Sequence, residues 1–144
     1  MSGTGETNLG RILSTLNPVL HPDEYIFTTI SDPPSSILYK TLREKYLTDM
    51  ICEFREPEGM TLVMKKSVAD IFSVSYDYVA RWITCKVHSS LSAVGLTSAL
   101  SHALAEAGLS CNIIAGYYHD HLFVKSDTVD KAMDILRDLV KPDL

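Results

Sequence analysis

The segment that decides the fold is ITCKVHSSLSAVGLTSALSHALAEAGLSCNIIAG, which runs from Ile83 to Gly116. Its first residues alternate between apolar and polar side chains, the period-two pattern of a strand with one buried face. Apolar residues then recur at helical spacing as far as Gly108, which is placed to end a helix, and the alternation returns from Cys111. The segment therefore predicts a strand, a helix and a second strand, in that order.

The junction between the first of these strands and the helix is rich in serine, and it reads HSSLSAVG from His88 to Gly95. The first amides of a helix have no partner inside the helix, so this junction can bind a carboxylate or another small anion. We expect the turn Ser89–Thr97 to do so, with Asn112 supplying an orienting amide. The alternative is that the serines only cap the helix and that Gly95 allows close packing against the sheet.

Strands and short helices fill the rest of the chain, and the segment from Ile37 to Leu47 is ambiguous. We interpret that segment as part of an insertion with a short helix. Because hairpins outnumber crossovers, the pattern predicts an antiparallel α+β sandwich of the ferredoxin-like kind, with the helices on one sheet face. Strands are expected at Tyr25–Ile30, Met50–Phe54, Met60–Lys65 and His121–Lys125, and helices after Asn8, Ser67 and Asp127.

Length and composition limit the classes of protein to which the chain can belong. A length of 144 residues suits one ordinary domain or two very small ones, and a net charge of −5 argues against nucleic acid as the main partner. No apolar run approaches the roughly 18 residues that a membrane span needs, and the first eight residues lack the charged and apolar regions typical of a signal peptide. We therefore expect a cytoplasmic protein. The three cysteines lack CxxC spacing and fit buried, reduced thiols. They are Cys52, Cys85 and Cys111.

Two groups of residues suggest chemistry, and we weigh each against a simpler interpretation. His119 and His121 share a face if the strand is extended, but the other ligands of a zinc site are lacking, which favours surface histidines. His88 lies beside serines, but no acid is placed to orient it and there is no GxSxG motif. We therefore predict no catalytic residue, no metal and no cofactor. The polar residues Thr84, Lys86, Asn112 and His121 should lie on the sheet face away from the helices.

Long phrases of the sequence resemble small tandem ACT-domain proteins of bacteria and fungi. They are FREPEGMTLVMKKSVAD (Phe54–Asp70), WITCKVHSSLSAVGLTSALSHALAEAGLSCNIIAGYYHDHLFV (Trp82–Val124) and, for the opening helix and strand, LGRILSTLNPVLHPDEYIFTTI (Leu9–Ile30). The chain is more distantly similar to the cytosolic arginine sensor and to the regulatory ends of aspartate kinases. The resemblance implies two tandem ACT-like βαββαβ units, an N-terminal one at residues 1–78, with an insertion at about 32–48, and a C-terminal one at residues 79–144.

The resemblance also implies a function, because ACT domains bind amino acids or similar metabolites at grooves between domains or subunits. Many of them carry an acidic residue followed by x-Pro-Gly in the loop that faces the effector, where this sequence has SSLSAVG. We expect a non-catalytic regulatory protein that binds an amino acid and forms a homodimer. The alternative is a structural or dimerisation scaffold with a degenerate pocket. The positions that match the effector loop are Ser89, Ser90, Leu91, Val94, Gly95, Leu96 and Thr97.

Overall fold

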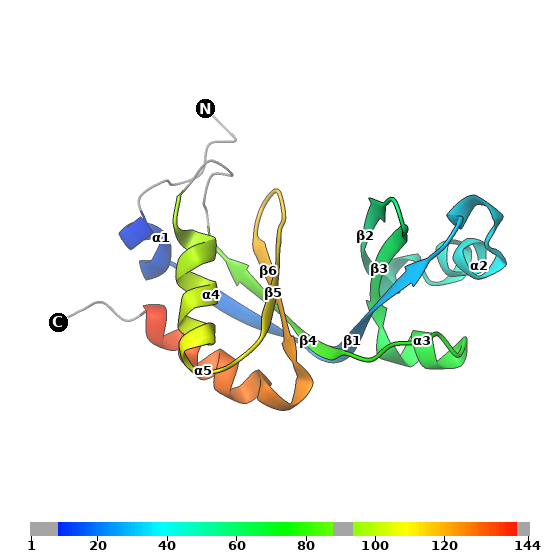
Figure 1. Cartoon of the computed structure of the whole chain (residues 1–144). Coiled ribbons are helices and arrows are strands. Elements are labelled where there is room, and N and C mark those ends of the chain that lie inside the picture. Colours follow the sequence, from blue (N-terminus) through cyan, green and yellow to red (C-terminus); the bar gives the residue numbers. More distant parts are fainter. Residues whose placement is uncertain (1–8, 88–93, 141–144) are drawn as a thin grey trace. The chain divides into compact units, whose positions relative to one another are not determined.

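The computed structural model describes residues 9–87 and 94–140. In this part of the chain, strands and helices form an antiparallel α+β structure, which confirms the predicted fold class (Figure 1). The chain divides into two compact units, which we call unit 1 (Met1–Pro22 with Arg81–Leu144) and unit 2 (Asp23–Ala80). No helix in the described ranges combines the length and the hydropathy that crossing a bilayer requires.

Unit 2 contains a sheet with the strand order β2-β3-β1. Its antiparallel pairing brings Ile26 opposite Met64 and Ile30 opposite Met60, so these residues share one face of the sheet. That face carries the core of the unit, where Leu42 is fully buried. The elements are the second part of β1 (Asn17–Ile30), η1 (Pro33–Ser35), α2 (Ile37–Lys45), η2 (Leu47–Asp49), β2 (Met50–Glu56), β3 (Gly59–Lys65) and α3 (Lys66–Ile71).

Unit 1 continues the strand order as β1-β4-β6-β5. The predicted alternation along β4 is confirmed, because Ile83, Cys85 and Val87 are buried in one cluster with residues of the helices. Fully burying one leucine in such a cluster contributes about 1.5–3 kcal/mol. The elements are α1 (Leu9–Ser14), the start of β1, β4 (Val79–Lys86), α4 (Leu96–Glu106), β5 (Cys111–Ala115), β6 (Asp120–Lys125), η3 (Ser126–Thr128) and α5 (Val129–Val140).

The end of α4 shows why the sequence signal at Gly108 was reliable. Gly108 has a φ of +75°, and its amide donates to the carbonyl of Ala105 at 2.9 Å. The next amide, of Leu109, donates to the carbonyl of Leu104 at 3.0 Å. This pair of hydrogen bonds is a Schellman motif, which uses carbonyls that the helix itself leaves unpaired.

Some element boundaries differ from the expected ones. Strand β1 begins at Asn17 rather than Tyr25, although Pro18 and Pro22 interrupt the strand signal. The last helix begins at Val129, because residues 126–128 form a 3-10 turn in which Asp127 lies. The ambiguous segment holds helix α2, which Ser36 caps by accepting a hydrogen bond from the amide of Tyr39 at 3.0 Å.

Candidate functional site

The predicted ligand loop in unit 1 is partly described. Ser89, Ser90 and Leu91 lie outside the described residues, and Gly95 is the N-cap of α4 with a φ of +98°. A Cβ on Gly95 would lie 3.2 Å from Cδ2 of Leu9, so the glycine allows close packing. Of the other predicted residues, Val94, Thr97 and Asn112 are exposed and Leu96 is buried. Ligand binding at this loop stays a prediction.

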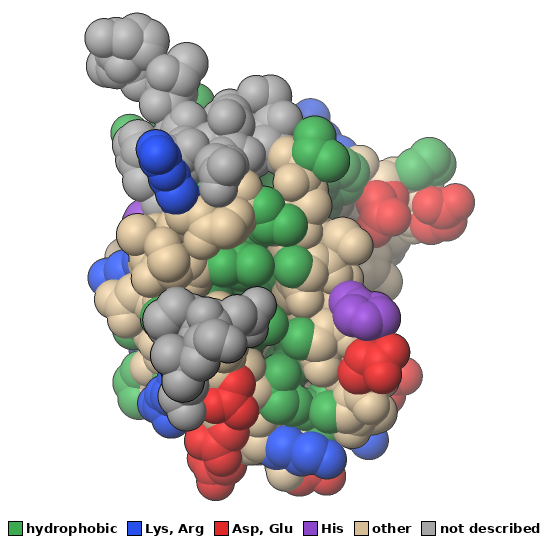
Figure 2. Space-filling model, turned by 90° about the vertical axis from the view of Figure 1, so that its left-hand side faces the viewer, with side chains coloured by type: hydrophobic (Ala, Val, Ile, Leu, Met, Phe, Trp, Pro, Cys, Tyr) green, Lys and Arg blue, Asp and Glu red, His purple; other side chains and the backbone are tan. Residues whose placement is uncertain are grey.

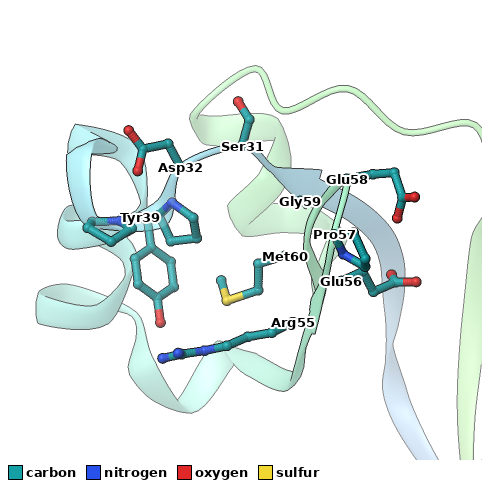
Figure 3. A pocket seen from close by; sticks show the side chains of 11 residues that line it. Ser31, Asp32, Tyr39, Arg55, Glu56, Pro57, Glu58, Gly59 and Met60 are labelled. Atoms are coloured by element: carbon teal, nitrogen blue, oxygen red, sulfur yellow. The ribbon is translucent and has the colours of Figure 1, made fainter.

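A cavity of about 380 Å³ lies in unit 2, between the loop that follows β1 and the β2–β3 hairpin (Figure 3). Its walls combine apolar and polar surfaces in similar amounts. Pro33, Pro34, Tyr39 and Pro57 contribute apolar rings to the lining. Tyr39 and Pro57 lie on opposite sides of it (Figure 3). The thioether of Met60 lies between them, and this side chain is almost fully buried. Ligand sites of small molecules have volumes of this size.

Charged groups of opposite sign border the cavity. The side chain of Arg55 extends from β2 below Met60 toward the hydroxyl of Tyr39 (Figure 3). Asp32 lies on the opposite rim of the cavity, with its carboxylate turned outward from Met60. Neither side chain makes a hydrogen bond or an ion pair with any residue in the described part of the chain. A ligand that carries both an anionic and a cationic group would therefore find a partner for each.

The loop that presents Asp32 is held in an unusual conformation. Asp32 has a φ of +50°, in the left-handed region, where aspartate is tolerated better than most side chains. Its carbonyl accepts a hydrogen bond from the amide of Ser35 at 3.0 Å, and two prolines follow it and fix their own φ angles. Backbone strain of this kind persists where the surrounding structure enforces it, and it is common at ligand sites.

A polar network fixes the wall that Tyr39 forms. The hydroxyl of Tyr39 donates to Oε2 of Glu53 at 2.9 Å and accepts from Arg43 at 3.2 Å. Arg43 also lies 3.4 Å from Oε1 of Glu53. The hydrogen bond with Tyr39, reinforced by Glu53, raises the pKa of the Arg43 guanidinium. These contacts hold the phenol ring against the cavity.

Sequence reasoning missed this cavity, although a signal was present. Asp32-Pro33-Pro34 follows a strand and precedes a helix, and it supplies an acidic residue followed by x-Pro. That is most of the pattern that we sought, and did not find, at Ser89–Gly95. The pattern lies at the strand-to-helix junction of unit 2 instead.

A second polar cluster lies on the sheet of unit 1. Thr84 was expected on an open polar face, but it is only 4% exposed, because its hydroxyl lies between two imidazoles. Nε2 of His21 is 2.8 Å from this hydroxyl, and Nδ1 of His121 is 3.0 Å from it. Burial lowers the pKa of both histidines, with Lys86 adding to the effect at His21. No group of three metal-ligand residues occurs in the ranges that the structure covers.

The cysteines differ in their burial. Cys85 is buried, whereas Cys52 and Cys111 are partly buried, and all three are free thiols. Burial raises the pKa of Cys85 to about 12 and that of Cys111 to about 11. These thiols are therefore protonated at neutral pH and unreactive as nucleophiles.

Comparison with known families decides the identity of the fold. A family model described as ACT domain matches residues 4–81, and a second ACT-domain model matches residues 78–138. The chain belongs to the ACT-domain family. This confirms the predicted tandem ACT arrangement, and it supports a regulatory, ligand-binding role in general.

Several solved structures resemble this one over most of its length. A protein of unknown function from Vibrio cholerae is 36% identical, with a TM-score of 0.76, and the match covers 92% of this chain and 96% of that one. The ligand-free regulatory subunit of aspartate kinase from Thermus thermophilus is 10% identical, with a TM-score of 0.64 and coverages of 88% and 99%. A protein from Agrobacterium tumefaciens is 15% identical, with a TM-score of 0.58 and coverages of 87% and 89%. At these lower identities the likeness concerns the fold alone. No curated protein matches the chain.

Proposed function

We propose that this ACT-domain protein is a non-catalytic regulatory protein that binds an amino acid in the cavity of unit 2. The observation that carries the proposal is the pair of charges, Arg55 and Asp32, which border the cavity and have no partner among the described residues. The guanidinium of Arg55 would bind the α-carboxylate of the ligand through two parallel hydrogen bonds. Asp32 would bind the α-ammonium group.

The loop of unit 1 remains a second proposed site for the same class of ligand. Like the cavity of unit 2, it lies at a strand-to-helix junction. The N-cap Gly95 provides no side-chain cap, so the first amides of α4 would bind a carboxylate there. Asn112 lies on β5 with its side chain exposed. One site in each ACT-like unit would be consistent with the predicted division of the chain into residues 1–78 and residues 79–144.

We also propose that the protein acts as a homodimer in the cytoplasm. Figure 2 shows hydrophobic side chains gathered on the face of unit 1 that it displays, and Leu9, Leu13 and Leu139 are hydrophobic residues of this unit that its core buries only in part. Val94 is 84% exposed. Sedimentation velocity measures the oligomeric state directly, and a monomer at micromolar concentration would contradict this part of the proposal.

The test of ligand binding is a thermal-shift screen of the twenty amino acids at millimolar concentration, followed by calorimetric titration. A ligand at roughly 100 times its Kd should stabilise the native protein by about 2.7 kcal/mol. The variant R55A should lose this stabilisation. The matched control is R137A, because Arg137 is an arginine of α5 with 61% of its side chain exposed. If no amino acid raises the Tm, the binding proposal fails and a scaffold role replaces it.

A further inference from the structure

The cavity of unit 2 also indicates which amino acids it would accept, an inference that rests on the proposed function. The α-carboxylate of a ligand would pair with Arg55, and its α-ammonium group would pair with Asp32. The apolar surfaces left for the ligand's side chain then include the rings of Pro33, Pro34 and Pro57, and the thioether of Met60. We propose that the cavity selects amino acids with an apolar side chain.

Met60 is the central residue of this apolar surface. It lies on β3 opposite Ile30, and only 4% of it is exposed. A methionine thioether is flexible and polarisable, so it adapts to aliphatic and aromatic groups alike. The ring of Tyr39 faces the same space, and its hydroxyl is already engaged by Glu53 and Arg43. This wall therefore offers an apolar surface to the ligand.

The two glutamates of the lining turn their carboxylates away from its apolar centre at Met60. Glu56 accepts a hydrogen bond from the hydroxyl of Thr61. The carboxylates of Glu56 and Glu58 both point away from Met60 (Figure 3). Arg43 and Glu53 pair with each other outside the cavity lining. An ionised side chain placed against Met60 would lose hydration without a carboxylate directed toward it, which is costly.

The size of the cavity sets the expected trend among apolar ligands. About 380 Å³ accommodates side chains larger than that of alanine, so each added methylene would bury more apolar surface. Burial of one methylene contributes about fourfold in affinity. Affinity should therefore rise from glycine through alanine and 2-aminobutyrate to norvaline and methionine. Aspartate and lysine should bind at least about 100-fold more weakly than methionine.

The experiment is calorimetric titration of the full chain with this series, and with aspartate and lysine. A stepwise rise in affinity with side-chain length, together with weak binding of the two charged amino acids, supports the inference. Equal affinity for glycine and methionine, or tightest binding of a charged amino acid, overturns the inferred selectivity. The proposed function, amino-acid binding, would survive that result. Absence of binding by every member overturns both the inference and the proposed function.

Variants of Met60 test the contact directly. M60A should lower the affinity for methionine by about tenfold and leave the affinity for glycine within about twofold, because glycine does not reach this wall. Since Met60 is buried, M60L serves as a variant of conserved volume if M60A does not fold. M60L should retain the preference for long apolar side chains. If M60A and M60L both lower glycine and methionine binding equally, Met60 does not contact the ligand's side chain and the inference fails.

Discussion

The imidazole of His21 lies flat against the indole of Trp82, with their ring centroids 3.5 Å apart and their planes 9° apart. The indole also donates a hydrogen bond from Nε1 to Nδ1 of His121 at 3.1 Å. Because an indole N–H can only donate, Nδ1 of His121 must be unprotonated. The hydroxyl of Thr84 must then donate to the same nitrogen, which leaves its oxygen to accept from Nε2–H of His21. The cluster therefore requires both imidazoles to be neutral or His21 alone to be charged.

The free energy of unfolding should depend on pH through this cluster. The folded-state pKa values of His21 and His121 are lowered, by burial first and then by neighbouring cations. The unfolded chain, whose histidines titrate near about 6.5, therefore binds more protons than the native state as the pH falls. The contribution of this cluster to stability should be constant above about pH 7.5 and should decrease below about pH 6.5. Urea unfolding between these values and pH 5 measures this change.

A matched pair of variants isolates the source of that pH dependence. H121Q removes one of the two imidazoles with lowered pKa and should flatten the decrease in stability. H102Q is the control, because His102 lies on α4 with 73% of its side chain exposed. The control should keep the slope of the native protein. An unchanged slope in H121Q would show that the cluster does not cause the pH dependence.

The hydroxyl of Thr84 should be important for stability. T84V keeps the shape of the side chain but removes the donor to His121 and the acceptor for His21, and this site is only 4% exposed. Leaving buried polar groups without partners costs about 1–3 kcal/mol. The control T48V changes an exposed threonine and should stay within about 0.5 kcal/mol of the native protein. Chemical denaturation gives both values, and equal stabilities of the two variants would contradict the prediction.

The hydroxyl of Tyr39 should affect ligand binding more than stability. In Y39F the ring is no longer held by Glu53 and Arg43, so it is less well ordered when the ligand arrives. We expect affinity for the best amino acid to fall about two- to tenfold. Because these hydrogen bonds are exposed, the free energy of unfolding should change by less than about 1 kcal/mol. Y118F is the control, since Tyr118 is an exposed tyrosine of the β5–β6 hairpin. Equal affinities of the two variants would show that the hydroxyl has no positioning role.

Local signals in the sequence were sufficient for most of the fold. Alternation from Ile83 and the stop at Gly108 predict β4 and α4 because the side-chain pattern and the backbone geometry are both set by near neighbours. The start of β1 was missed, because Pro18 and Pro22 are unfavourable in a strand and only pairing with distant strands offsets this. The burial of Thr84 was missed for the same reason, since its partners lie on two other strands.

The candidate site was the least predictable part from sequence. Its lining comes from two segments, residues 31–39 and residues 55–60, which the pairing of β1 with β3 brings to one end of a sheet. The partner of a charge such as Arg55 cannot be read from its neighbours in sequence. By contrast, the serine-rich loop at Gly95 was conspicuous in the sequence, and the described residues leave its role open as a prediction.

Gly59 and Gly108 both have positive φ angles, but they should respond differently to substitution by alanine. At Gly108 (φ +75°) a Cβ would meet no atom within 4 Å, so G108A should cost only the backbone strain, about 1 kcal/mol. At Gly59 (φ +154°) a Cβ would lie 2.7 Å from Oγ1 of Thr29 and 3.2 Å from the carbonyl oxygen of Ile30. G59A should therefore cost about 2–3 kcal/mol, because strain and overpacking add.

Gly59 also lines the cavity of unit 2, so the same variant reports on the site. A shift of the β2–β3 hairpin away from Thr29 would move Arg55, and G59A should weaken amino-acid binding whereas G108A should not. The double variant T29A/G59A removes the hydroxyl that the new Cβ would meet, and it should recover part of both the stability and the affinity relative to G59A. Denaturation and calorimetric titration of the three variants measure these effects. If G59A costs no more than G108A, the hairpin yields to the added methyl group without strain, and the close approach of Gly59 to Thr29 does not constrain the site.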